Sequence, residues 1–230
     1  MLNRTLALAV IVGVFSCTSA KADELQSNIL AAAKASRQDA YSFQRTMVFE
    51  RTGSARKVLV ERYDPRGSAA ERWKLISVDG HRPNAKDVDQ SRKAKRGPVP
   101  SYAELAEWFG TAATRRDGPP GYVTYQYARL PAGVLKIGSR DVSADTRAEA
   151  LVSVRGGKSF VEQVRFTSNK EFRMAMVASV ERIDVIRRYR LLPTGRAVPE
   201  GSVSMLTGSF LGKSGQIKTT VEFDSFQAVK

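Results

Sequence analysis

The second half of the chain is an almost unbroken series of short alternating segments, and this feature most restricts how the chain can fold. From Gly121 onward, apolar and polar residues alternate with the period of two that is typical of a half-buried strand. The predicted strands are 122–129, 148–155, 159–168, 172–179, 180–191, 203–211 and 217–226. Short breaks with turn residues separate most of them, and such breaks join antiparallel neighbours. We therefore expect an antiparallel sheet.

Residues 23–78 add a helix and three strands. Residues 23–39 carry a narrow apolar stripe at helical spacing, and alternation begins at Tyr41. The inward phase of this first strand holds Tyr41, Phe43, Arg45, Met47 and Phe49. Two more strands are predicted at 56–63 and 72–78, with turn chemistry between them.

Two further helices are predicted between the third and fourth strands. Asn84 is placed to cap a short helix over 85–95. Ser101 and Glu104 have the spacing of a capping box, and Gly110 follows where a helix usually ends. Residues 111–120 are predicted to be a loop.

This inventory predicts an α+β fold. A sheet of about ten strands curls, and its inner face must be covered by the only helices available. We expect a strongly curved antiparallel β-sheet (an unclosed barrel) with inserted helices that cover the concave face. An apolar cavity follows unless side chains fill it. No repeat or low-complexity segment divides the chain, so a single domain is expected over 23–230.

Residues 1–22 have the pattern of a secretory signal peptide. Arg4 precedes an apolar run over 6–15, and Ala20-Lys21-Ala22 predicts cleavage before Asp23. The run is too short to span a bilayer, although an uncleaved anchor is an alternative. Cys17, the only cysteine, offers a second alternative, an outer-membrane lipoprotein. With ordinary cleavage the protein is periplasmic and has no cysteine for a disulfide or a metal site.

The chain is strongly basic, with a net charge of +14. Such a charge attracts anionic surfaces, and export makes nucleic acid an unexpected partner. An anionic membrane surface is the expected partner, although the charge also serves solubility alone. The basic residues expected to steer the protein to it are Lys86, Arg92, Lys93, Lys95 and Arg96.

Residues that could carry catalysis are sparse. His81 is the only histidine, and it lies in a predicted turn without a nucleophile or a second ligand nearby. The carboxylates most closely grouped are Asp87, Asp89, Glu104 and Glu107, and they resemble a mixed-charge helical surface. We expect no catalytic residue, no metal and no cofactor.

Arg45 is unusual because it shares the inward phase of apolar neighbours. An arginine that faces a core requires a partner, such as helix carbonyls or the polar head of a ligand. The simpler interpretation is that its head reaches water at the open rim.

The helix that leads into Tyr41-Ser42-Phe43-Gln44-Arg45, followed by long strands, resembles the periplasmic lipoprotein carriers of the LolA/LolB-like superfamily. Members have an unclosed barrel with a helical lid over a hydrophobic cavity. They often carry an arginine beside a tryptophan after a proline, and here Arg72 and Trp73 follow Pro65. By this resemblance, Arg72 ties the sheet to the lid.

These observations predict a periplasmic, non-enzymatic binding protein for a hydrophobic or lipidated ligand. Its partners would be lipid or lipoprotein acyl chains and an anionic membrane surface, and the oligomeric state is left open. The candidate cavity residues are Phe43, Met47, Phe49, Arg72, Trp73, Leu105, Trp108, Phe109, Phe172, Met174 and Met176. The alternative is an envelope structural or regulatory module that binds a protein partner or an anionic polymer and has no ligand cavity.

Overall fold

The structure is a computed structural model that describes residues 23–37, 41–94, 99–175, 178–210 and 212–229. The side chains at positions 174, 175 and 210 lie outside this description. Residues 1–22, and with them the predicted signal peptide and Cys17, also lie outside the described residues, as do Lys95 and Arg96. None of the described helices combines the length and the apolar character needed to cross a bilayer.

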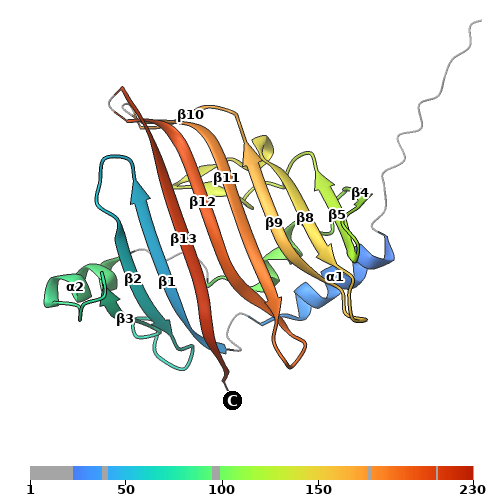
Figure 1. The fold of residues 1–230 in the computed structure, drawn as a ribbon, viewed down its shortest axis with the longest axis horizontal. Helices are drawn as coiled ribbons and strands as arrows, with labels where there is room; N and C mark the ends of the chain where they lie inside the picture. Colours follow the sequence, from blue (N-terminus) through green and yellow to red (C-terminus); the bar gives the residue numbers. More distant parts are fainter. Residues whose placement is uncertain (1–22, 38–40, 95–98, 176–177, 211, 230) are drawn as a thin grey trace, which may run out of the picture.

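One large antiparallel sheet dominates the fold (Figure 1). Its strand order is β3-β2-β1-β13-β12-β11-β9-β8-β5-β4, with β10 also paired to β11. The strands are β1 (Tyr41–Arg51), β2 (Lys57–Tyr63), β3 (Trp73–Val78), β4 (Thr114–Asp117), β5 (Tyr122–Tyr127), β8 (Arg147–Ser153), β9 (Phe160–Ser168), β10 (Phe172–Ala175), β11 (Ala178–Leu191), β12 (Ala197–Phe210) and β13 (Lys213–Ala228). A separate small ribbon pairs β6 (Lys136–Ile137) with β7 (Arg140–Asp141).

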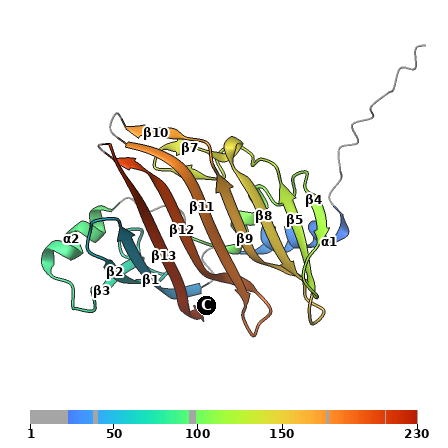
Figure 2. The ribbon, with the colours of Figure 1, turned by 45° about the horizontal axis from the view of Figure 1, so that its top comes forward.

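The helices are α1 (Glu24–Ala35), α2 (Ala85–Lys93) and the 3₁₀ helices η1 (Tyr102–Glu107) and η2 (Ser143–Asp145). In Figure 1, α1 lies behind the sheet and α2 lies at its left edge, beside β2 and β3. Figure 2 shows the curvature of the strands in a second view. Because β3 and β4 are the two ends of the described strand order, the sheet curls without closing. The predicted α+β class, a curved antiparallel sheet with inserted helices, is confirmed.

Several predicted boundaries are wrong. The predicted strand 172–179 is divided between β10 and the start of β11, and the predicted loop 111–120 contains the edge strand β4. The second inserted helix is a short 3₁₀ segment, although the Ser101 N–H does donate to Glu104 at 3.0 Å, as half of the predicted capping box. The β6–β7 ribbon was not predicted.

Strand β12 begins six residues earlier than predicted and includes Pro199. Proline lacks the N–H that a ladder needs, so it is normally confined to edges and bulges. Here Pro199 pairs with Tyr189 where the β11–β12 register shifts. The bulge explains how a proline is accommodated inside the sheet.

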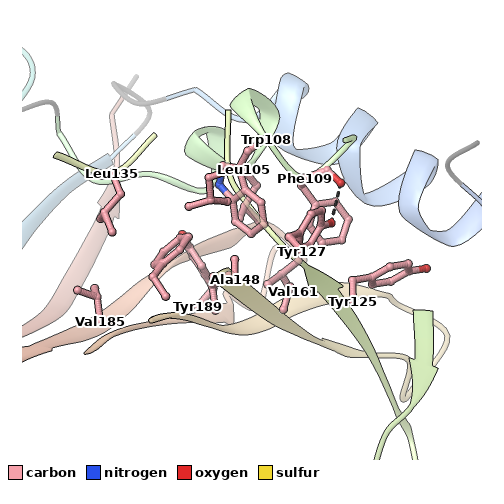
Figure 3. Close-up of a cluster of buried hydrophobic side chains, with 14 of the residues drawn as sticks. Leu105, Trp108, Phe109, Tyr125, Tyr127, Leu135, Ala148, Val161, Val185 and Tyr189 are labelled. Carbon is pink, nitrogen blue, oxygen red and sulfur yellow. Dashed lines mark hydrogen bonds between the residues drawn. The ribbon is translucent and has the colours of Figure 1, made fainter. Parts of the chain in front are cut away.

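The main core lies between η1 and the strands β5, β8, β9 and β11 (Figure 3). Leu105 and Trp108 are each 1% exposed and Phe109 is fully buried. The Tyr127 hydroxyl and the Gln26 side-chain amide donate to the Phe109 carbonyl at 2.7 and 2.6 Å. These bonds attach α1 and η1 to the sheet.

Gly110 follows η1 because α1 comes very close there. A Cβ at this position would lie 2.5 Å from a Leu30 methyl carbon of α1. Glycine therefore permits the packing of α1 against η1 and does not serve as a left-handed helix end, since its φ is not positive.

Candidate functional site

The concave face of the sheet is divided into a packed part and an incompletely covered part. Under α1 and η1, inward residues such as Ala150, Val164 and Phe166 are at most 1% exposed. On β1 and β13, the inward residues Phe49 and Ile217 are 37% and 45% exposed. Accessible apolar surface on this face is therefore found on β1 and β13.

The first hollow, which we call the α2 groove, lies between α2 and strands β1 to β3 and has a volume of about 470 Å³. Its apolar lining consists of Met47, Phe49, Leu59, Trp73, Leu75, Val78 and Ala94. Its polar lining consists of Arg45, Lys57, Glu61, Asp87, Gln90 and Ser91. This volume falls within the range of about 300–1,000 Å³ that is typical of small-molecule sites.

A buried ion pair forms one end of the α2 groove. The Arg45 guanidinium pairs with the Glu61 carboxylate, and the exposed fractions of these side chains are 16% and 3%. The guanidinium carbon of Arg45 also lies 4.0 Å from the centre of the Trp73 ring. The Ser91 hydroxyl of α2 donates to Glu61 at 3.3 Å. These contacts link the sheet to α2, which has no buried residue of its own.

Arg45 therefore does not extend into water at the rim, and that interpretation is wrong. The opposing strand supplies the counter-charge, since β2 places Glu61 directly across from Arg45. Arg72 does not link the sheet to a helix through any bond found in the described residues. It is exposed, and its Nε donates to the Gly67 carbonyl at 3.2 Å in the β2–β3 connection. The contact expected of Arg72 is made by Arg45.

A second hollow, which we call the α1–β1 pocket, has a volume of about 460 Å³ and lies at the C-terminal end of α1. Its aromatic and aliphatic lining includes Tyr41, Phe43, Phe160, Leu191 and Phe226. Its basic lining residues are Arg37, Lys158 and Arg196. The two hollows lie on either side of an aromatic cluster in which the Phe43 ring centre is 5.7 Å from that of Trp73.

The predicted site residues are thus distributed over three places. Phe43 lines the α1–β1 pocket, whereas Met47, Phe49 and Trp73 line the α2 groove. Leu105, Trp108 and Phe109 belong to the packed core, and so does Phe172.

The sequence also predicted that Met174 and Met176 line the cavity. The side chain of Met174 and the whole of Met176 lie outside the described residues.

Sequence reasoning missed Leu59, Glu61 and Leu75 as groove residues. A usable signal was present, because Leu59, Glu61 and Tyr63 share one phase of the predicted strand 56–63. A glutamate in that phase, opposite the inward Arg45, indicates a buried pair once the hairpin register is known.

Three of the four grouped carboxylates singled out in the sequence are engaged in structural contacts. Asp87 accepts from the Asn84 N–H, Asp89 pairs with Lys93, and Glu104 pairs with Arg187. His81 is exposed and bridges to Val78 in a turn. No cluster of three or more potential metal ligands is found in the described part of the chain.

The buried phenols of the core do not favour proton transfer. Burial raises the pKa of Tyr102, Tyr127 and Tyr189 far above the ordinary value of 10.0. These hydroxyls stay neutral near pH 7 and act as hydrogen-bond partners in the core.

By its sheet order and its helices, the protein is an α+β protein with a curved antiparallel sheet that partly surrounds inserted helices. No protein-family model matches the chain, and no curated protein is similar to it in sequence. A crystal structure of a LolA superfamily protein from Nitrosomonas europaea aligns with 92% of this chain and 95% of its own, at 9% identity and a TM-score of 0.43. The fold assignment comes from the architecture of this chain itself.

Proposed function

We propose that this protein is a periplasmic, non-enzymatic binding protein that lodges an acyl chain of a lipid or a lipidated protein in the α2 groove. The observation that carries the proposal is the apolar, incompletely covered face of β1 and β2 beneath α2. Burial of each methylene there contributes about 0.8 kcal/mol. Seven apolar residues line the groove, so a chain of several methylenes gains enough for measurable binding.

The helix α2 is suited to cover a ligand reversibly. It has no buried residue, and the Ser91 hydroxyl donates to the Glu61 carboxylate of the sheet. Displacing it exposes little apolar surface of its own, so the cost of opening is low. Its exposed residues Lys86 and Arg92 face solvent, and they would attract an anionic membrane surface.

The test compares two substitutions of exposed alanines at the C-terminal ends of two helices. Ala94→Trp places an indole in the α2 groove, whereas Ala35→Trp places one at the α1–β1 pocket. We expect Ala94→Trp to weaken binding of the neutral fluorescent probe N-phenyl-1-naphthylamine at least tenfold. Ala35→Trp should leave that binding within twofold of the unsubstituted protein.

Thermal unfolding of both variants checks that they are folded. A second measurement is mass spectrometry of lipid extracted from protein purified out of its own envelope. Equal binding by both variants, together with no co-purified lipid, would contradict the proposal.

One observation favours the alternative, an envelope module that binds a protein partner or an anionic polymer without a ligand cavity. The space beneath η1, where the sequence predicted a cavity, is filled by Leu105, Trp108 and Phe109. If the probe does not bind at all, this alternative is the better account of the fold.

A further inference from the structure

The α1–β1 pocket combines an aromatic floor with cations at its margin. Lys158 comes from the β8–β9 connection and Arg196 from the β11–β12 connection, and both are exposed. No carboxylate lines the pocket among the described residues, and no ion pair is found for either cation in the same part of the chain. Cations gathered without a counter-charge favour an anion between them.

The ammonium group of Lys158 lies close to the backbone at Gly195. Gly195 has a φ of +79°, a conformation that glycine adopts readily. A Cβ at this position would lie only 2.5 Å from the Lys158 Nζ. The ammonium group of Lys158 therefore reaches the β11–β12 connection beside Gly195, the residue that precedes Arg196.

The floor of the pocket is apolar and only partly covered. Tyr41, Phe160 and Phe226 are half-buried, while Phe43 is 4% exposed beneath them. Inorganic anions gain nothing from such a surface, whereas an acyl chain does.

We propose that the α1–β1 pocket binds a single-chain anionic amphiphile. Its chain lies against Phe43 and Phe226, and its carboxylate or phosphate head faces Lys158 and Arg196. The inference concerns a pocket other than the α2 groove, so it does not depend on the proposed function. In this proposal the α1–β1 pocket recognises a negative charge, whereas the proposed binding in the α2 groove depends on apolar burial alone.

The first test separates charge from apolar burial. The probes are 11-(dansylamino)undecanoic acid and its uncharged methyl ester, measured by fluorescence at low salt. We expect the acid to bind about 2- to 30-fold more tightly than the ester, the gain of two exposed ion pairs. The preference should shrink as salt is added, because exposed charges are screened.

Substitutions then show which residues cause the preference for the acid over the ester. Lys158→Gln with Arg196→Gln should abolish it, while Lys74→Gln with Arg129→Gln, a control with the same charge change at exposed positions elsewhere, should retain it. Ala35→Trp should weaken binding of the acid at least fivefold. Ala94→Trp should preserve the preference for the acid over the ester. If Ala35→Trp fails to fold, the two glutamine double variants still test whether Lys158 and Arg196 cause this preference.

Competition distinguishes an amphiphile from a free anion. Dodecyl phosphate should displace the acid, whereas inorganic phosphate at the same concentration should not. Equal displacement by inorganic phosphate would overturn the proposal, and so would an acid preference that persists without Lys158 and Arg196. If the preference for the acid over the ester is absent while the neutral probe still binds in the α2 groove, only the proposal for the α1–β1 pocket is contradicted. The two proposals can therefore be tested separately.

Discussion

The Tyr125 hydroxyl donates to the Asp23 carboxylate at 2.7 Å and so joins the residue that caps α1 to strand β5. The same carboxylate accepts from the Gln26 N–H at 2.8 Å and from Arg115 at 3.1 Å. Partial burial opposes the charge, but these hydrogen bonds prevail and lower the pKa of Asp23 below its usual 3.8. One carboxylate therefore joins the N-terminal end of α1 to β4 and β5.

Asp23→Asn should lower the free energy of unfolding at pH 7 by about 1 kcal/mol, because charge-assisted bonds are lost. Since the folded-state pKa is depressed, the charge stabilises the protein above the unfolded pKa, and this contribution is lost as pH falls below about 3.8. The free energies of unfolding of the two proteins should therefore become similar below this pH. Urea unfolding at pH 7 and pH 3 measures this, with the exposed Glu200→Gln as a control. A difference that does not change with pH would contradict the role of the charge.

The exported protein should begin at Asp23. The predicted signal cleavage lies immediately before this residue. N-terminal sequencing of protein recovered from the envelope should give Asp-Glu-Leu-Gln. Cys17→Ser should leave export and the N-terminus unchanged, whereas loss of the processed form would favour the lipoprotein alternative.

Removal of one partner of the Arg45–Glu61 pair should be costly. Arg45→Met leaves a carboxylate that is 3% exposed without its main counter-charge, at a cost of about 3–5 kcal/mol. The double variant Arg45→Met, Glu61→Leu should recover most of this loss, because no charge stays buried. Urea unfolding of the two single variants and the double variant gives the coupling free energy. Additive losses would show that the pair is not the source of the effect.

The packed and the incompletely covered parts of the concave face should respond differently to truncation. Trp108→Ala should cost about 3–5 kcal/mol, because it opens a cavity in the core. Phe49→Ala should lower the free energy of unfolding by less than about 1 kcal/mol, since this ring is 37% exposed. The same substitution should nevertheless weaken binding of the neutral probe. Unfolding and probe titration are measured on both variants. Equal stability losses would mean that Phe49 is a core residue.

Local sequence patterns predicted most elements because their signals are local. Alternation located β1, β2 and β9, and Asn84 marked the cap of α2. The patterns failed where a boundary depends on a neighbouring strand. The predicted strand 203–211 left out Pro199, whereas β12 includes it at the bulge where it pairs with Tyr189.

The residue pattern alone indicated that inward-facing strand residues need helices to cover them. The division of that face depends on how the helices pack against the strands. Trp108 and Phe109 fill the space beneath η1, while the polar α2 covers Met47 and Phe49 incompletely. The packing of the strands also determines that Arg45, and not Arg72, makes the buried pair, because its partner Glu61 lies on another strand. Residue phase is a property of one strand, whereas pairing and cavity volume depend on how strands and helices meet in space.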